Sequence, residues 1–244
     1  MNTSRRVEPE WLDELRADDP RATRSRRDLR RVNALMRNAF IIERELRRSF
    51  RAESPRVIAE IGAGDGTFML RLAEKIAARW QDVRVVLLDR QDIVCPQILA
   101  ELGSLGWQAE AAAADVFEWL ARPADRIFDV IIANLFLHHF DAERLTALLH
   151  AAARRTRLFV ACEPRRSGLA LAGSRLLWAV GCNDVSRHDA VVSVCAGFDG
   201  RELSALWPDD PVWTLRERAG GLFSHCFVAS RIDRRSAAGS DAKI

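Results

Sequence analysis

The sequence has 244 residues, of which 48% are hydrophobic and 29% are charged. This balance excludes a disordered or fibrous chain and suits one α/β domain with appendages. The net charge of +3 is a mild bias that does not require an anionic partner.

The N-terminal segment MNTSRRVEPEWLDEL is charged and lacks the apolar core of a signal peptide. The apolar stretch near 128–137 is shorter than the roughly 20 residues that span a bilayer, and Arg175 interrupts the stretch at 168–180. The 5 cysteines form no CxxC pair, and their odd number argues against a full disulfide framework. We therefore expect a cytoplasmic protein with buried, reduced thiols at Cys95, Cys162, Cys182, Cys195 and Cys226.

Residues 1–51 are rich in arginine and are expected to form a helical appendage. Apolar residues recur there at spacings of three, four or their multiples, which places them on one helix face. They are Leu29, Val32, Met36, Phe40, Leu46 and Phe50. Two interpretations remain open: the helix packs this stripe on the domain, or it forms a lid over a ligand or a surface for anionic membrane or RNA.

From residue 56 onward, strand-like and helix-like segments alternate, which predicts a doubly wound α/β sheet. Expected strands are 56–61, 84–89, 107–112, 128–133 and 157–162, with helices at 67–79, 93–105, 116–120 and 141–154. An insertion at about 164–200 follows, then a helix at 201–206. Runs at 212–218 and 222–231 predict a hairpin that completes the domain of 52–231, and 232–244 is expected to be a frayed tail.

The segment VIAEIGAGDGTF joins an apolar strand to a helix through a loop with Gly62, Gly64 and Gly66. Glycine permits a ligand to approach the backbone at the carboxyl end of a strand. A dinucleotide site would require a third glycine where Thr67 stands. Glu60 and Asp65 would also repel the phosphates of a dinucleotide. S-adenosylmethionine (SAM) instead carries a positively charged ammonium and a sulfonium, which these carboxylates would attract. The charge pattern favours SAM.

Three further strand ends carry polar side chains at suitable spacing. Asp89 ends the second strand and can accept hydrogen bonds from ribose hydroxyls. Asp115 ends the third strand, where it either contacts the adenine amino group or caps the next helix. Asn134 ends the fourth strand. Glu60 and Asp89 could alternatively be ordinary carboxylates at strand ends.

These elements, in this order, resemble the class I SAM-dependent methyltransferases over roughly residues 57–140. The resemblance implies a Rossmann-like, seven-stranded sheet with its last strand antiparallel, and SAM as the cofactor, converted to S-adenosylhomocysteine (SAH). The segment NLFLHHF is most similar to the small-molecule branch that includes quinone-biosynthesis methyltransferases. The implied cofactor residues are Glu60, Gly62, Ala63, Gly64, Gly66, Asp89, Arg90, Asp115, Val116, Asn134 and Leu135.

The insertion is the expected acceptor region, because ligands of open α/β sheets bind beyond the carboxyl ends of the strands. It contains the apolar run GLALAGSRLLWAVG and then a polar cluster of Asn183, Asp184, Arg187, His188 and Asp189. This combination favours a hydrophobic phenol, quinone or polyketide-like acceptor, methylated on oxygen or carbon.

His188 is the first candidate general base and His139 the second, although either histidine could be structural. The histidine spacing predicts no metal site. Glu163 and Arg165 follow the fifth strand, either at the pocket rim or as solvated loop charges.

Two other functions stay open. The arginine-rich N-terminus fits an RNA methyltransferase, although NLFL stands where base methylation would favour an NPPY-like loop. The absence of an unambiguous base fits an inactive SAM-binding partner subunit. The leading partner is a small-molecule acceptor, with nucleic acid disfavoured and with a homo-oligomer and peripheral membrane contact through the N-terminal helix left open.

Overall fold

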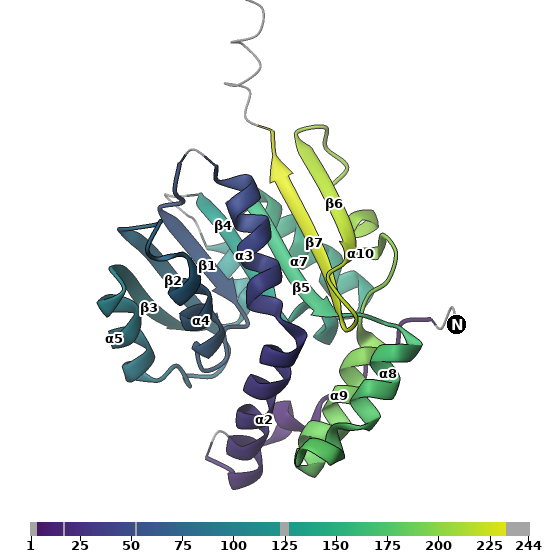
Figure 1. Cartoon of the computed structure of the whole chain (residues 1–244). Coiled ribbons are helices and arrows are strands. Elements are labelled where there is room, and N and C mark those ends of the chain that lie inside the picture. Colours follow the sequence, from purple (N-terminus) through teal and green to yellow (C-terminus); the bar gives the residue numbers. More distant parts are fainter. Residues whose placement is uncertain (1–3, 17, 52, 123–126, 233–244) are drawn as a thin grey trace, which may run out of the picture.

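The computed structural model describes residues 4–16, 18–51, 53–122 and 127–232 (Figure 1). Except for Ile232, the tail expected at 232–244 lies outside these residues.

One seven-stranded sheet organises the chain, with the strand order β3-β2-β1-β4-β5-β7-β6. Neighbours from β3 to β5 are parallel, and β7 runs antiparallel to both β5 and β6. The strands are β1 (Val57–Ile61), β2 (Val83–Asp89), β3 (Trp107–Ala113), β4 (Phe128–Asn134), β5 (Thr156–Pro164), β6 (Trp213–Ala219) and β7 (Ser224–Arg231). The predicted fold class is therefore confirmed.

Helices cover both faces of the sheet, because alternate strand residues point to opposite sides. One face carries α3 (Asn38–Ser49), α4 (Thr67–Ile76) and α5 (Pro96–Ser104), packed on Ile58, Val85 and Val130. The other carries α6 (Val116–Ala121), α7 (Ala142–Arg155) and α10 (Glu202–Leu206), packed on Ala59 and Ile131. Two apolar cores thus enclose the sheet.

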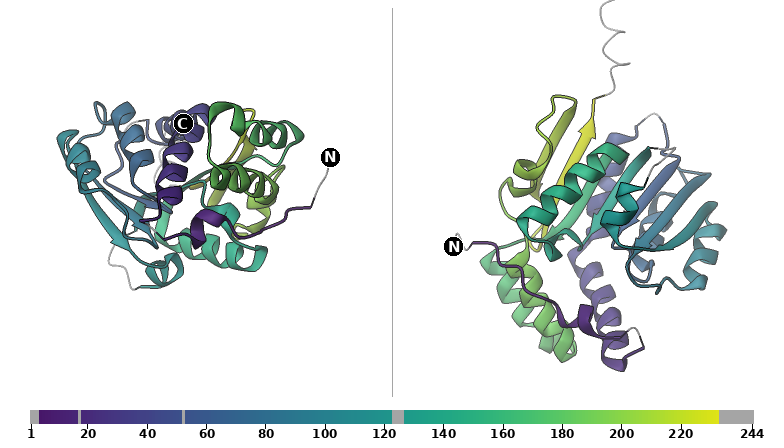
Figure 2. Two further views of the ribbon diagram at one scale, coloured as in Figure 1. Left: turned by 90° about the horizontal axis from the view of Figure 1, so that it is seen from below. Right: turned by 180° about the vertical axis from the view of Figure 1, so that it is seen from behind.

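A further group of helices lies beyond the carboxyl ends of the parallel strands (Figure 2). It contains α1 (Trp11–Glu14), α2 (Pro20–Met36), α8 (Gly168–Arg175), the short 3-10 helix η2 (Leu177–Val180) and α9 (Asp184–Ala196). Both α1 and α2 contact α9. The N-terminal appendage and the insertion therefore meet at the end of the sheet where a ligand is expected, and the helical character of both is confirmed.

The expected N-terminal stripe does not lie on one continuous helix. Arg37 has φ 58° and separates α2 from α3, because a left-handed residue ends an α-helix. Leu46 of α3 is buried in the core, whereas Phe40 is 44% exposed. The stripe prediction was therefore wrong about continuity, and within α3 it holds for Leu46 but not for Phe40.

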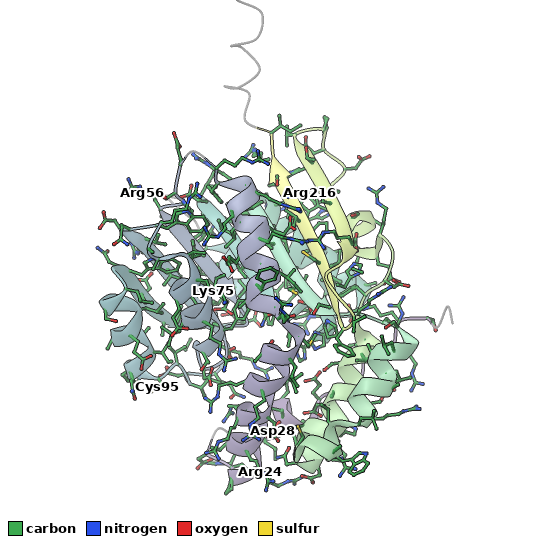
Figure 3. All side chains as sticks on the ribbon, in the orientation of Figure 1. Arg24, Asp28, Arg56, Lys75, Cys95 and Arg216 are labelled. Carbon is green, nitrogen blue, oxygen red and sulfur yellow. The ribbon has the colours of Figure 1, made fainter. Side chains whose placement is uncertain are left out.

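Other expectations had mixed outcomes. Cys162, Cys182 and Cys226 are buried thiols, but Cys95 is exposed (Figure 3). No helix among the described residues is long and apolar enough to cross a membrane.

Candidate active site

The glycine loop between β1 and α4 adopts backbone angles that favour glycine. Gly62, Gly64 and Gly66 have φ values of 71°, 57° and 80°, a region that other residues rarely adopt. A side chain at Gly62 would collide with the ring of Phe136, whereas the space beside Gly64 is open. The loop therefore leaves its backbone accessible at Gly64.

A cavity of about 1020 Å³ opens beside this loop at the carboxyl ends of β1, β2 and β4. Every predicted cofactor residue except Gly66 lines it, and Gly66 instead packs over apolar side chains of β2 and α5. The lining cofactor residues are Glu60, Gly62, Ala63, Gly64, Asp89, Arg90, Asp115, Val116, Asn134 and Leu135. Sequence reasoning thus selected residues that the fold brings together.

Glu60 is the most unusual charge in this cavity. Its carboxyl group is buried, and Oε2 has no hydrogen-bond partner among the described residues. Burial, and then the charges of Asp65 and Asp89, raise the pKa of Glu60 well above its ordinary value. A cationic ligand would relieve this penalty, so the site fits the ammonium group of SAM.

Asp89 fixes the loop from the neighbouring strand. Its Oδ2 accepts a hydrogen bond from the N–H of Gly64 at 2.8 Å, and its Oδ1 accepts one from the N–H of Gln91 at 2.9 Å. A carboxylate oxygen has two lone pairs, so both oxygens can still accept a ribose hydroxyl. Whether Asp89 also contacts the ribose stays a prediction.

Asp115 caps α6, as one of its two interpretations expected. Its Oδ1 accepts hydrogen bonds from the N–H groups of Phe117 at 2.8 Å and Glu118 at 3.3 Å. The same residue lines the cavity, and the structure records no partner for its Oδ2 among the described residues. The cap and an adenine contact are therefore compatible.

Leu135, directly after β4, has φ 52°. A bulky residue in the left-handed region is a genuine conformational outlier, and such strain is common at functional sites. Its N–H donates to the carbonyl oxygen of Cys162 at 2.9 Å, which holds the turn against β5.

The far wall of the cavity comes from α2 and the insertion, which a buried polar contact joins. Asp28 of α2 accepts hydrogen bonds from the N–H of Asn183 at 2.9 Å and the hydroxyl of Ser186 at 3.2 Å (Figure 3). Ser186 also contacts Ser25 at 2.9 Å. These bonds fix the two helices as one wall.

The N-terminal segment before α2 completes the enclosure. The guanidinium of Arg5 donates to the carbonyl oxygens of Ala196 at 2.8 Å and Phe140 at 2.7 Å. Glu10 and Asp13, farther along the segment, line the cavity. The sequence alone gave no indication of these contacts.

His138 lies between two carboxylates. Its Nδ1 is 2.8 Å from Glu163 and its Nε2 is 3.3 Å from Glu10. Burial alone would lower the pKa of His138, but the bonds to Glu10 and Glu163 outweigh burial and raise it to about 9. Burial likewise opposes ionisation of Glu10, yet the bond from His138 lowers the pKa of Glu10 to about 2. His138 is therefore an imidazolium near neutral pH and is not a general base.

Glu163 corrects the expectation of a solvated loop charge at this position. It is fully buried at the end of β5, and its Oε1 accepts hydrogen bonds from the N–H groups of Phe136 and Leu137 at 3.0 Å each. Glu163 thereby fixes the turn after β4. This turn contains the 3-10 helix η1 (Leu137–His139), which carries His138 and His139.

The two candidate bases differ in position. His139 lines the cavity, and its Nδ1 lies 3.3 Å from Oδ2 of Asp13. His188 does not line the cavity; its ring stacks on Trp11 at 3.8 Å, and its Nδ1 lies 2.9 Å from Asp189. The geometry therefore favours His139 over His188 for contact with an acceptor.

The sequence suggested that the polar residues of the insertion form one compact group at the acceptor site. In the structure they do not form such a group at the cavity. Asp189 lines the cavity, whereas Asn183, Asp184 and Arg187 do not. Asn183 caps α9, and Asp184 pairs with an arginine of α2 on the exposed surface. Adjacent residues of a helix point in different directions, which separates the members of the cluster.

Glu10, His138 and His139 also bring one possible metal-ligand atom each within 4.8 Å of one another. Histidine spacing in the sequence gave no sign of this group, because Glu10 comes from the distant N-terminal segment. Since both ring nitrogens of His138 already contact carboxylates, the ion pairs account for the cluster, and we assign it no metal.

Comparisons with known proteins agree with this geometry. Residues 58–157 match the model of a family described as a methyltransferase domain. The matched segment runs from β1 to the start of β5 and contains the glycine loop and the strand-end acids. With the order of the sheet and its antiparallel β7, this match identifies a class I SAM-dependent methyltransferase domain in the chain.

Solved structures are similar over most of the chain. The plantazolicin methyltransferase BpumL in complex with SAH is 12% identical, with a TM-score of 0.66, and the match covers 88% of this chain and 92% of that one. The magnesium protoporphyrin IX methyltransferase of Synechocystis PCC 6803 with bound SAM is 12% identical, with a TM-score of 0.53, and the match covers 91% of this chain and 88% of that one. An O-methyltransferase family protein from Burkholderia thailandensis is 16% identical, with a TM-score of 0.57, and the match covers 89% of this chain and 62% of that one. At these identities the likeness concerns the fold. A comparison with curated protein sequences gives no match.

Proposed function

We propose that this methyltransferase acts on a small, largely hydrophobic acceptor with an acidic hydroxyl group, such as a phenol, a quinol or a polyketide-like aromatic compound. The observation that carries the proposal is one cavity shared by the SAM loop and an apolar wall. Its volume of about 1020 Å³ suits a small-molecule site that holds two ligands. The wall includes Leu29, Val32, Leu35, Met36, Leu176, Leu177 and Phe223.

In this proposal the donor lies along the strand ends. Glu60 receives the ammonium group, Asp89 the ribose hydroxyls and Asp115 the adenine amino group, as the family resemblance implies. Asn134 and Leu135 adjoin the methyl group. The open space beside Gly64 supports close approach of the methionine part of SAM to the backbone.

Methyl transfer is an in-line displacement, in which the acceptor oxygen forms a bond to the methyl carbon as the bond from carbon to sulfur breaks. SAH leaves, and the hydroxyl proton must go to a base. We assign that role to His139, because its Nε2 has no hydrogen-bond partner among the described residues and its ring lines the cavity. A phenol gains from such a base, and the enclosing helices exclude water.

An RNA substrate receives less support. Several arginines of α2 and α3 form ion pairs with carboxylates of the same chain, such as Arg30 with Asp65 at 2.8 Å and Arg47 with Glu43 at 2.9 Å. The cavity is also enclosed by α2 and α9, which suits a small acceptor. Binding to RNA that weakens steeply with added salt would favour the RNA function instead.

The test begins with calorimetric titration of SAM, SAH and NAD. We expect binding of SAM and SAH, and loss of both in Gly64→Arg, which fills the open space by the loop. Gly103→Arg is the matched control, because Gly103 lies in α5 with open space around it.

Labelled SAM is then supplied with a panel of hydrophobic phenols and quinols. Label in a phenol or quinol supports the proposal. Label that appears only in RNA or protein contradicts it, and SAM binding without transfer to any acceptor favours a partner subunit.

A further inference from the structure

Four polar side chains from four separate segments meet beside the expected methyl group. They are Asn33 of α2, Asn38 of α3, Asn134 at the end of β4 and Ser224 at the start of β7. Asn38, Asn134 and Ser224 are buried, and Asn33 and Asn134 line the cavity. Buried amides require hydrogen-bond partners, and these side chains satisfy one another in a hydrogen-bond network. Since some of its members are buried and others line the cavity, the network extends from the core to the cavity.

The direction of the hydrogen bonds in this network can be derived from its inner end. Ser224 Oγ lies 2.7 Å from the side chain of Asn38, a distance typical of an O–H donor and short for an N–H donor. Other groups near this hydroxyl are the thiol of Cys162 and the carbonyl oxygen of Met36, which lies at 3.5 Å and is the weaker acceptor by distance. Ser224 therefore donates, and the amide oxygen of Asn38 accepts.

The remaining bonds follow in sequence. With its oxygen facing Ser224, Asn38 donates from Nδ2 to Oδ1 of Asn134 at 2.9 Å and to Oδ1 of Asn33 at 3.4 Å. Asn134 also donates from Nδ2 to Oδ1 of Asn33 at 3.3 Å. Turning Asn33 over would place its NH2 group against two N–H donors and break both bonds.

The outer end of the network is therefore a donor. Oδ1 of Asn33 accepts two bonds, and its amide nitrogen has no hydrogen-bond acceptor among the described residues. Because Asn33 lines the cavity, its N–H groups are available to a ligand there. An acceptor oxygen would satisfy them, whereas an acceptor that presents only N–H groups would meet donors.

We propose that Asn33 is a specificity-determining residue that donates a hydrogen bond to the reacting oxygen of the acceptor, so that the enzyme selects a phenolate over an amine. This inference rests on the proposed function and deepens it. Donation to the oxygen stabilises its ionised form, which is the better nucleophile, while the apolar wall holds the ring.

Binding of two coloured probes to the SAH complex tests the proposal without any methyl transfer. The probes are 4-nitrophenol, whose phenolate is seen by its absorbance, and 4-nitroaniline, which has the same size and carries an amine. We expect the wild-type complex to favour the phenolate. Asn33→Asp replaces the donor with an oxygen of the same shape and should weaken phenolate binding by about tenfold or more.

The affinity of Asn33→Asp for SAH should stay within about twofold of wild type. A tenfold loss of phenolate binding then arises at the acceptor side and not from damage to the donor site. Asn33→Leu is a second variant that removes the donor without adding charge, and Gln108→Glu on the exposed face of β3 is the matched control for charge. Equal phenolate binding by wild type and both Asn33 variants overturns the proposal, as does a preference of the wild type for 4-nitroaniline. Absence of phenolate binding to the wild-type SAH complex overturns it too. Phenolate binding that depends on Asn33, without methyl transfer to any acceptor, would instead refute the proposed function alone.

Discussion

Replacing Glu60 with glutamine should strengthen the fold of the ligand-free protein and weaken SAM binding. In the folded protein, burial and neighbouring acids raise the pKa of Glu60 well above 4.5. The folded state therefore keeps a proton that the unfolded chain releases, so wild-type stability falls as the pH rises from about 4.5 towards the raised pKa. Over that range the slope reaches about 1.4 kcal/mol per pH unit.

Glu60→Gln removes this slope, so its stability advantage over wild type should grow with pH. Binding should change in the opposite direction, because the variant loses a hydrogen bond between charged groups worth about 1.5 to 3 kcal/mol, or roughly 10- to 150-fold in the Kd for SAM. Chemical denaturation between about pH 5 and pH 7 measures the change in stability, and calorimetry measures SAM binding, with the exposed Glu101→Gln as control. A variant that is less stable than wild type and binds SAM normally would refute this account of Glu60.

Three further outcomes are expected. His138→Gln leaves two buried carboxylates without their partner, so it should lower the free energy of unfolding by about 3 to 5 kcal/mol at pH 6, as measured by chemical denaturation. Because the pKa of His138 is raised from 6.5 to about 9, this loss should shrink as the pH rises through that interval. A loss that does not depend on pH would contradict the ion pair. Iodoacetamide should label the exposed Cys95 in the native protein and spare Cys162 and Cys226, whose thiol pKa values are raised first of all by burial, as mass spectrometry can check. Arg37→Gly should raise the free energy of unfolding by about 1 kcal/mol, since glycine tolerates the left-handed conformation, and a destabilised variant would show that the Arg37 side chain contributes more than its backbone costs.

The grouping of the proposed donor residues at one cavity could be predicted because the information for it is local. A strand, a glycine loop and a helix follow one another directly, Asp89 and Asn134 each end a strand, and Asp115 follows the end of β3 by two residues. Parallel strands bring their carboxyl ends to one edge, so the sequence pattern determines proximity. The seven-stranded sheet with its antiparallel last strand followed from the same pattern and from the family resemblance.

The acceptor half could not be predicted, because its contacts join segments that are distant in sequence. Glu10 meets His138, and Asn33 meets Asn134, through tertiary packing that leaves no periodic signal. From the sequence, His188 therefore ranked above His139 as candidate general base. In the structure the ring of His188 packs on Trp11, and His188 does not line the cavity. Glu163 did carry a signal that was undervalued: it ends a buried parallel strand, as Glu60 and Asp89 do.

The two halves of the cavity come from different stretches of the chain. The segment recognised as a methyltransferase domain, 58–157, contains the predicted donor residues, whereas α2, α8 and α9 lie outside it. In the proposed function, mutations in those helices would alter the choice of acceptor during evolution while the donor site stays constant. For enzyme engineering, this separation makes the two flanking segments the natural place to diversify a library.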